Sequence, residues 1–407
     1  MMEKLPKDWK WCKLNEVAEI TSSKRIFQSD YVSEGIPFYR TKEIKELSEG
    51  KDLTIDLFIS HEKYNEIKSK FVLPKIGDVL LSAVGTIGIS YIVKTDKPFY
   101  FKDGNLMWFR NLSELDSLFL SYGLTNFIRY SNNAKTSGSA YSALTIETMK
   151  NFHFPLPPLK TQQQIVSKIE ELFSELDKGV EDLKKAQQQL KTFRQSVLKW
   201  AFEGRLTNEN VKDGVLPKRW KNVKMNEIVT LSSQKHSPTT IENIFYIGLE
   251  HIEKHSGKLT SKVGIEKIST VKNKFIKGDI LYGKLRPNLN KVHLSKEDGV
   301  CSTDILVLKL SKECLGKYLH PIMLSSKFVN EMSENTSGVN LPRVSTKFIM
   351  NYEIPLPPID EQEIIVQEIE SRLRVADKLE ENIKESLQKA EALRQSILKK
   401  AFCGELV

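Results

Sequence analysis

Two histidines and one acidic–basic triplet are the residues whose types and spacing could support chemistry. His251 and His255 are four residues apart, so on a helix both would face one side and could bind a metal ion. A third ligand is not evident, and exposed histidines in a basic loop are the simpler explanation. The triplet Glu66-Ile67-Lys68 has the spacing of the second half of a PD…ExK nuclease motif, but the sequence contains no Pro-Asp dipeptide. We therefore expect no metal site and no nuclease site.

The motifs of nucleotide-driven motors and methyltransferases are also missing. The sequence has no GxxxxGK[ST] phosphate-binding loop, and no FxGxG followed by NPPY or DPPY. The PLPP segments at 155–158 and 355–358 lack the asparagine that NPPY requires. Four cysteines without CxxC spacing argue against a zinc cluster or disulfides and favour a reducing compartment. We expect no catalytic residue and no cofactor-binding residue in this chain.

The elements that could position binding residues occur twice. Residues 155–206 align without a gap on residues 355–406, with 23 of 52 positions identical. LPKDWKWCKLNEVAEI at 5–20 has a second copy, LPKRWKNVKMNEIVTL, at 216–231, and IGDVLLS at 76–82 corresponds to KGDILYG at 277–283. The chain is therefore predicted to contain two copies of one unit, each a mixed domain followed by a long helix.

The repeated segment after each PLPP predicts a helix of about 40 residues, or roughly 60 Å at 1.5 Å per residue. Apolar residues recur at two heptad positions, which is typical of a coiled coil. In the first copy these positions are Ile165, Leu172, Gly179, Ala186 and Phe193, with Ile169, Leu176, Leu183, Leu190 and Val197. In the second they are Ile365, Arg372, Leu379, Ser386 and Leu393, with Ile369, Ala376, Ile383, Ala390 and Ile397. We expect the two helices to pair with each other, antiparallel, about a pseudo-two-fold axis. The alternative is that each helix pairs in a separate dimer.

The domain before each helix is predicted to be mixed α and β, so the fold class is α+β. Strand-like runs are 71–82, 99–110 and 304–310. Amphipathic helical runs are 115–130 and its counterpart 315–332.

The net charge of +9 is unevenly distributed along the chain. Residues 1–154 carry +2, 155–215 carry +1, 216–354 carry +9 and 355–407 carry −3. A basic excess confined to one domain favours a polyanionic partner such as a nucleic acid.

The two copies differ in the loops that follow shared elements. After the shared strand, one copy reads SAVGTIGIS at 82–90 and the other GKLRPNLNKV at 283–292. Near the domain end, TSGSAYSAL at 136–144 corresponds to TSGVNLPRV at 336–344. A shared scaffold with divergent loops suits two readers of different DNA sequences, because cationic and amide side chains contact phosphates and base edges. The candidate DNA-binding residues are Lys24, Arg25, Arg40, Lys42, Ser82, Thr86, Ser137, Tyr141, Lys284, Arg286, Asn288, Asn290, Lys291, Asn340 and Arg343. For any one of them, a solvated loop residue is the alternative.

Four motifs together resemble the specificity (S) subunit of type I restriction-modification systems. They are the LPxxW start, the GD[IV]L strand, the PLPPxxxQxxIV entry and the RQS[IV]LKxAFxGxL helix end, each present in both copies. The resemblance covers essentially the whole chain. It implies two target-recognition domains at 1–154 and 216–354, a spacer helix with its linker at 155–215, and a second spacer helix at 355–407.

The resemblance also implies partners and cofactors. Such a subunit reads a split, asymmetric target on double-stranded DNA, while its helices set the spacing and dock two methyltransferase (M) subunits. S-adenosylmethionine would then bind the M subunits, and ATP and Mg²⁺ the endonuclease/translocase (R) subunits, with no cofactor in this chain. A cytoplasmic, membrane-free location is expected, because no run of 18 apolar residues and no signal-peptide segment occur. The alternatives are a coiled-coil scaffold and a free-standing nucleic-acid-binding protein.

Overall fold

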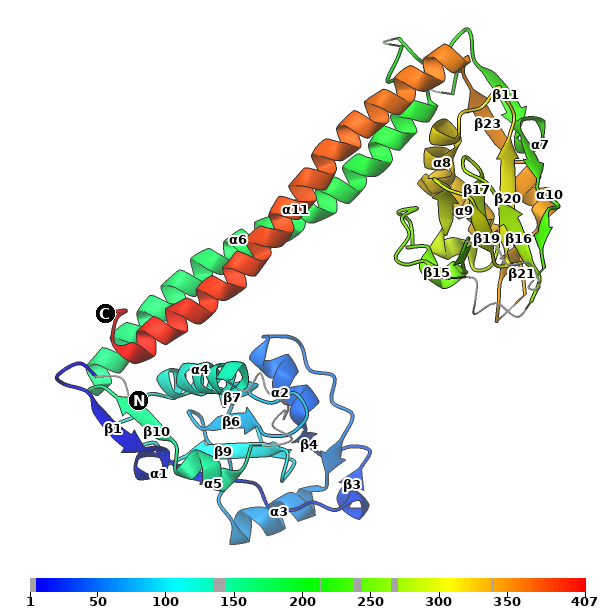
Figure 1. Cartoon of the computed structure of the whole chain (residues 1–407). Coiled ribbons are helices and arrows are strands. Elements are labelled where there is room, and N and C mark those ends of the chain that lie inside the picture. The colour runs from blue at the N-terminus through cyan, green and yellow to red at the C-terminus, as the bar shows by residue number, and fades with distance from the viewer. Residues whose placement is uncertain are drawn as a thin grey trace. The chain divides into compact units, whose positions relative to one another are not determined.

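A computed structural model of the chain describes residues 5–134, 144–208, 210–212, 214–237, 244–264, 270–338 and 340–407. The chain divides into two compact units, drawn in Figure 1. Unit 1 comprises Met1–Leu183 and Glu385–Val407, and unit 2 comprises Lys184–Lys384. Each unit thus combines one mixed α/β domain with parts of both long helices.

The elements of unit 1 form a domain that ends in the first long helix. They are β1 (Lys10–Lys13), α1 (Leu14–Val17), β2 (Glu19–Thr21), β3 (Tyr31–Val32), β4 (Ile36–Tyr39), α2 (Thr41–Ser48), β5 (Phe58–Ile59), α3 (His61–Lys70), β6 (Val79–Ser82), β7 (Ser90–Ile92), β8 (Tyr100–Phe101), β9 (Leu106–Arg110), α4 (Ser117–Ala134), α5 (Ile146–Lys150), β10 (His153–Leu156) and α6 (Leu159–Phe202). Strands β2-β9-β6-β7 form one sheet, β3-β5-β4-β8 a second, and β1 pairs with β10.

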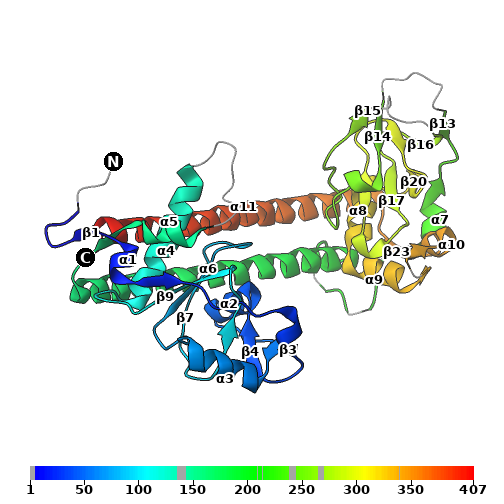
Figure 2. The same cartoon turned by 90° about the horizontal axis from the view of Figure 1, so that it is seen from below.

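Unit 2 repeats this plan after α6. Its elements are β11 (Lys221–Lys224), α7 (Met225–Ile228), β12 (Val229–Leu231), β13 (Lys235–His236), β14 (Phe245–Ile247), β15 (Val263–Gly264), β16 (Lys272–Phe275), β17 (Ile280–Gly283), β18 (Val292–Leu294), β19 (Gly299–Cys301), β20 (Ile305–Leu310), α8 (Gly316–Leu324), α9 (Ser326–Glu334), β21 (Thr336–Ser337), β22 (Arg343–Val344), α10 (Thr346–Met350), β23 (Glu353–Leu356) and α11 (Ile359–Cys403). In Figures 1 and 2, α8 lies on the side of the unit 2 sheet that faces the long helices.

The sheet topology confirms the duplication. The order β12-β20-β17-β18 in unit 2 matches β2-β9-β6-β7 in unit 1, and β11 pairs with β23 as β1 does with β10. In both units a parallel pair joins the second sheet, β4 with β8 and β14 with β19. The repeated Gly-Asp dipeptide forms the turn before β6 and β17, where Gly77 and Gly278 have φ values of 93° and 94°. Since L side chains rarely adopt such values, glycine suits both turns.

Three predicted element bounds are corrected by the structure. The strand predicted over 71–82 begins only at Val79, because Pro74 and the Gly77 turn interrupt the extended run. The run 99–110 forms two strands, β8 and β9, separated by a turn that contains Gly104. The helix predicted over 315–332 is two helices, since Ser325 adopts an extended conformation and its side chain caps α9 by accepting a hydrogen bond from the Phe328 amide.

The two long helices pair antiparallel, as predicted. In unit 1 the first half of α6 and the end of α11 share one hydrophobic core, in which Ile165 and Ile169 pack with Ile397 and Ala401. In unit 2 the end of α6 shares a core with the start of α11. The helices have 44 and 45 residues, slightly longer than predicted.

The predicted heptad seam is only half right. The heptad position that begins at Ile169 in α6 and at Ile369 in α11 is buried or half-buried along both helices. In the other set, Phe193, Leu379 and Leu393 are 38%, 47% and 52% exposed. The helices therefore bury one of the two predicted heptad positions along their length and the other only in part.

Candidate nucleic-acid interface

Two loops that differ between the copies lie side by side in unit 2. The Arg286 amide donates to the Pro342 carbonyl at 2.7 Å, and the Val344 amide donates to the Lys284 carbonyl at 3.1 Å. An isolated bridge also joins Leu285 to Arg343. The loop after β17 and the β21–β22 hairpin therefore form one surface, which was not evident from their wide separation in the sequence.

Unit 1 has the same junction at the equivalent place. The Leu144 amide donates to the Ala83 carbonyl at 3.0 Å, as the Val344 amide does to the Lys284 carbonyl. The loop after β6 thus approaches the segment before α5. Ser137 and Tyr141, both candidate DNA-binding residues, lie outside the described residues.

Arg286 is an exposed cation of the unit 2 surface. Its side chain is exposed, and its backbone is left-handed, with φ of 50°. Its amide is held by Pro342, and its carbonyl accepts from the Leu289 amide at 2.9 Å. Among the described residues, no side chain pairs with its guanidinium group. A fixed backbone with a free, planar side chain suits a bidentate contact to guanine or phosphate.

The neighbours of Arg286 on this surface are also polar and accessible. Asn288 and Asn340 are exposed, and Lys284 is half-buried. Arg343 is exposed, and its guanidinium lies 3.6 Å from the Asp304 carboxylate. Of the predicted DNA-binding residues, the structure therefore places five on this surface: Lys284, Arg286, Asn288, Asn340 and Arg343.

Two other candidates of this loop shape it instead. The Asn290 side chain is only 1% exposed and its backbone is left-handed, with φ of 42°, so this residue forms the turn and does not reach a base edge. Lys291 donates from its ammonium group to the Leu249 carbonyl, and partial burial lowers its pKa. Burial corrects Asn290 from a contact residue to a structural one, whereas a DNA contact by the half-buried Lys291 stays a prediction.

In unit 1, Ser82 is corrected for the same reason. Its side chain is fully buried, its hydroxyl donates to the Thr86 carbonyl at 2.6 Å, and it accepts from the Ile89 amide at 2.8 Å. Ser82 thus closes the loop after β6. Thr86 itself is exposed at the loop tip and is available to a ligand.

The basic candidates near the start of unit 1 have partners of their own. Arg25 pairs with Asp103 at 3.3 Å, Lys42 pairs with Asp56 at 3.1 Å, and the Lys24 ammonium lies 5.0 Å from the centre of the Phe71 ring. These exposed contacts are weak and can be exchanged for phosphates.

Arg40 is held more firmly than these three. Its guanidinium binds the carboxylate of Glu43, a residue that is only 1% exposed, at 2.6 Å. Burial raises the pKa of Glu43, but the hydrogen bonds from Arg40 outweigh this effect, so the pKa lies below its ordinary value. Removing Arg40 would leave a buried carboxylate unpaired, so its first role is structural.

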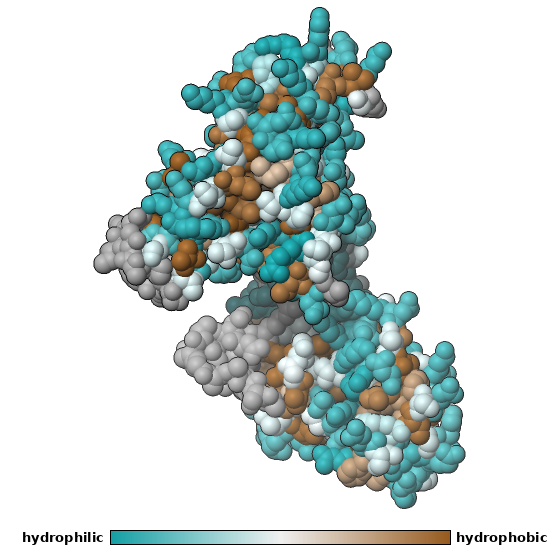
Figure 3. All heavy atoms as spheres, turned by 90° about the vertical axis from the view of Figure 1, so that its right-hand side faces the viewer, coloured by the Kyte–Doolittle hydropathy of each residue, from teal (hydrophilic) through white to brown (hydrophobic). Residues whose placement is uncertain are grey.

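The outer surface agrees with a polar partner. Figure 3 shows mostly hydrophilic side chains on the face drawn, with hydrophobic residues in small separate groups.

No helix among the described residues is long and apolar enough to cross a membrane. The same residues contain no cluster of three or more His, Cys, Asp or Glu side chains placed to hold a metal ion. His251, one of the two histidines with metal-like spacing, is buried, and its Nδ1 accepts from the Gly248 amide at 3.0 Å.

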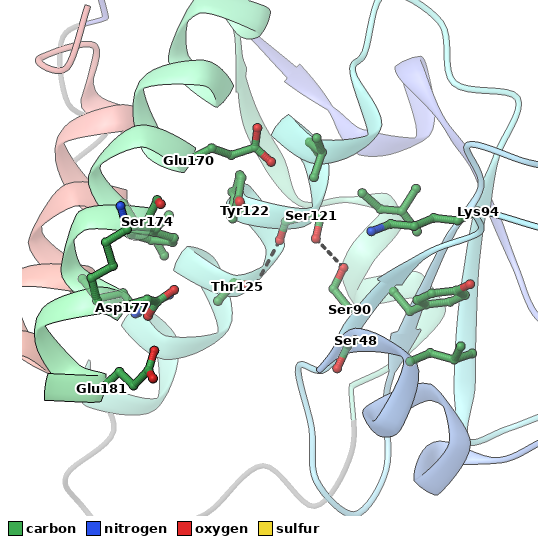
Figure 4. A pocket seen from close by; sticks show the side chains of 18 residues that line it. Ser48, Ser90, Lys94, Ser121, Tyr122, Thr125, Glu170, Ser174, Asp177 and Glu181 are labelled. Atoms are coloured by element: carbon green, nitrogen blue, oxygen red, sulfur yellow. Dashed lines mark hydrogen bonds and ion pairs between the residues drawn. The ribbon is translucent and has the colours of Figure 1, made fainter. Parts of the chain in front are cut away.

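A groove occurs at the same place in both units, between the domain and the long helices. In unit 1 it has a volume of about 740 Å³ and lies between β7, α4 and α6, as Figure 4 shows. Ser90 and Ser121 line it and are hydrogen-bonded to each other, with hydroxyls 2.7 Å apart, and Glu170 and Asp177 line the α6 side. The groove of unit 2, of about 900 Å³, lies between β18, α8 and α11.

Sequence reasoning missed these grooves, although the duplication contained a signal for them. Glu170 and Asp177 recur as Glu370 and Asp377, which line the unit 2 groove. The unit 2 groove is the more basic, since its lining includes Lys258, Lys262, Lys296, Lys317 and Arg374. Identity between the two copies could have marked the shared acidic residues.

A family model, described as the type I restriction modification DNA specificity domain, matches residues 6–185 and 217–389. The chain belongs to this family. The two matched ranges correspond to the two copies, each taken with part of the helix that follows it. Type I specificity domains therefore account for most of the chain.

Curated relatives agree with this family. The chain is 30% identical to the specificity subunit of the type I restriction enzyme EcoDI of Escherichia coli, over 62% of this chain and 62% of that subunit. It is 28% identical to the Escherichia coli EcoBI specificity subunit, over 67% of this chain and 62% of that subunit. The chain thus matches somewhat less than two thirds of the length of these relatives.

Solved structures share the fold. A chain from a study of complex assembly and conformational transition of the type I restriction-modification system aligns with a TM-score of 0.75, at 18% identity, over 99% of both chains. The HsdS subunit from Thermoanaerobacter tengcongensis aligns with a TM-score of 0.57, at 20% identity, also over 99% of both chains. These likenesses support the specificity-subunit fold of two mixed domains and paired antiparallel helices.

Proposed function

We propose that this chain is the DNA-reading subunit of a type I restriction-modification complex and that each domain reads one half of a split, asymmetric target. The observation that carries the proposal is the pair of equivalent surfaces. In both units the loop after the shared strand is bonded to the segment before α5 or α10, and these are the segments in which the copies differ. A constant scaffold with variable paired loops is what two independent readers require.

Contacts to DNA would then be divided by residue type. In unit 2, Arg286 and Asn288 would contact base edges in the major groove, and Lys284 and Arg343 would contact phosphates. The charge of +9 over residues 216–354 would draw this domain to DNA and make its binding sensitive to salt.

Methyl transfer and cleavage would belong to partners. Two methyltransferase subunits with S-adenosylmethionine would dock along α6 and α11, and endonuclease subunits with ATP and Mg²⁺ would join them. The helices offer exposed apolar side chains for docking, of which Trp200 is 40%, Val375 59% and Leu379 47% exposed. The basic groove of unit 2 would accept acidic residues of such a partner.

A domain exchange tests the proposal. The predicted boundary after residue 154 falls within β10, which pairs with β1, so the exchange should end at Pro157 to keep both strands together. Residues 1–157 are replaced by the equivalent block of a related subunit, and the host methylome is sequenced with the partner subunits present. We expect a change in one half of the methylated sequence only.

The opposite exchange, of residues 216–357, is the matched control and should change the other half. A change in both halves, or in neither, would contradict independent reading. Affinity purification from the native cell should recover a methyltransferase, whereas a free-standing DNA-binding protein or a scaffold would be recovered without one.

A further inference from the structure

A buried glutamine joins each domain to its long helix in the same way. Gln162 lies in the first turn of α6, and Gln362 is the equivalent residue of α11; both side chains are fully buried. Each belongs to the PLPPxxxQ motif that occurs in both copies. Their positions fall where the extended PLPP segment leaves the domain and the helix begins.

The hydrogen bonds of the two glutamines correspond one to one. Gln162 Oε1 accepts from the Asp116 amide at 2.8 Å, while Nε2 donates to the Glu114 carbonyl at 2.7 Å and the Pro157 carbonyl at 2.9 Å. The amide group thus binds one donor and two acceptors of the backbone. Both protons of Nε2 are used, so the side chain is fixed in one orientation.

In unit 2 the distances are nearly the same. Gln362 Oε1 accepts from the Leu315 amide at 2.9 Å, and Nε2 donates to the Glu313 carbonyl at 2.8 Å and the Pro357 carbonyl at 2.9 Å. The junctions between domain and long helix differ in surrounding sequence, but in both of them the glutamine makes the same three hydrogen bonds to the backbone.

The residues that the glutamines hold begin the helix that packs beside the long helix. Asp116 precedes α4, and its carboxylate accepts from the Leu118 and Phe119 amides at 2.9 and 3.0 Å. Leu315 is the N-cap residue of α8. Each glutamine thus ties the start of the domain helix to the start of the long helix.

At this junction the glutamine bonds act beside apolar contacts, and in unit 2 the Lys317–Glu370 ion pair and two hydrogen bonds from Ser326 to Gln195 also join the domain to the long helices. Helices α4 and α6 meet through a hydrophobic core, in which the Tyr122 and Phe173 rings pack edge to face at 5.8 Å. Apolar burial is non-directional and tolerates small rotations, whereas three short hydrogen bonds at one point do not.

We infer that Gln162 and Gln362 are positioning residues that fix the orientation of each domain on its helix. They thereby set the spacer length between half-sites that the protein accepts. This inference rests on the proposed reading of a split target. It predicts that loosening either junction reduces discrimination between spacer lengths without changing the half-site sequences.

The test uses Gln162→Met and Gln362→Met in the complete methyltransferase complex. Methionine keeps similar volume but leaves three backbone groups without partners at each junction. Duplexes carry the methylated target with its natural spacer, or with a spacer one base pair shorter or longer. The preference for the natural spacer should fall at least tenfold, and amide exchange at Asp116 or Leu315 should accelerate at least tenfold.

Gln164→Met and Gln367→Met are the matched controls, because both residues are exposed on the same helices. They should keep the spacer preference of the wild type. If Gln162→Met does not fold, Gln162→Asn replaces it, since asparagine keeps an amide but is one methylene too short to reach its partners.

The outcomes separate the inference from the proposed function. An equal loss of affinity for all spacers, with the preference unchanged, would assign the glutamines to stability alone and overturn the inference. A wild-type complex that methylates no split target would overturn the proposed function instead.

Discussion

The end of the chain is predicted to stabilise the domain at its beginning. Phe402, near the end of α11, is 7% exposed, and its ring lies 4.8 Å from that of Phe119 and 5.9 Å from that of Phe154. Replacing a buried phenylalanine by alanine costs about 3–5 kcal/mol. Because Phe402→Ala also removes two aromatic contacts, we expect a loss in the upper part of that range for unit 1.

Phe202, the equivalent residue of α6, is the matched control. It is only half-buried in unit 2, and its ring lies 5.9 Å from that of Tyr318. Phe202→Ala should therefore cost less, about 1–2 kcal/mol. Both losses are measured by urea titration followed by hydrogen exchange and mass spectrometry, which reports each unit separately.

The two variants should affect different units. Phe402→Ala should lower protection in α4 and β10, and Phe202→Ala in α8. A loss below about 1 kcal/mol for Phe402→Ala, or equal losses for both variants, would refute the packing argument.

Three further predictions concern the interface and its stability. Arg286→Ala should weaken DNA binding by about 1–3 kcal/mol. If Arg286 contacts a base, the variant should lose sequence preference at a single position of the second half-site. If it contacts a phosphate, binding should weaken equally for all sequences, and the slope of log affinity against log salt concentration should be smaller by about 0.9. Unchanged affinity would remove this loop from the interface. Ser82→Ala should cost about 1–3 kcal/mol in thermal or urea unfolding, because the Ile89 amide loses its acceptor, whereas Thr86→Ala should not change stability. Burial lowers the pKa of His320 from 6.5 to about 4. Between these pH values the unfolded chain binds a proton at His320 and the folded chain does not. Unit 2 should therefore lose stability as the pH falls from 6.5 toward 4. The urea midpoint of the His320→Gln variant should fall less than that of the wild type over this pH interval. An identical fall in both proteins would show that His320 does not cause the loss of stability.

The duplication made the fold predictable from the sequence. Two copies of one pattern predicted two mixed domains, and five heptads with polar flanks predicted paired helices. Spacing could not predict the exposure of Phe193 and Leu393, because exposure depends on how the two helices pack against each other. Nor could it place the break at Ser325, which depends on local backbone conformation and capping.

The candidate site was predictable to a smaller extent. Residue type and divergence between the copies selected two loops that lie side by side in unit 2, and Arg286 and Asn288 are exposed on one of them. The same criteria included Ser82 and Asn290, which are buried. A hydroxyl or amide suits a DNA base and a loop backbone equally well, so composition alone does not distinguish a contact residue from one that closes the loop.

The discontinuity of unit 1 has a consequence for the order of folding during synthesis. Unit 2 is one continuous segment, Lys184–Lys384, whereas unit 1 needs Glu385–Val407 as well as Met1–Leu183. The hydrophobic core of unit 1 includes Ile397, Leu398, Ala401 and Phe402. The domain that leaves the ribosome first therefore completes its core only after residues 397–402 have been translated. A nascent chain that lacks these residues would expose the apolar faces of α4 and α6.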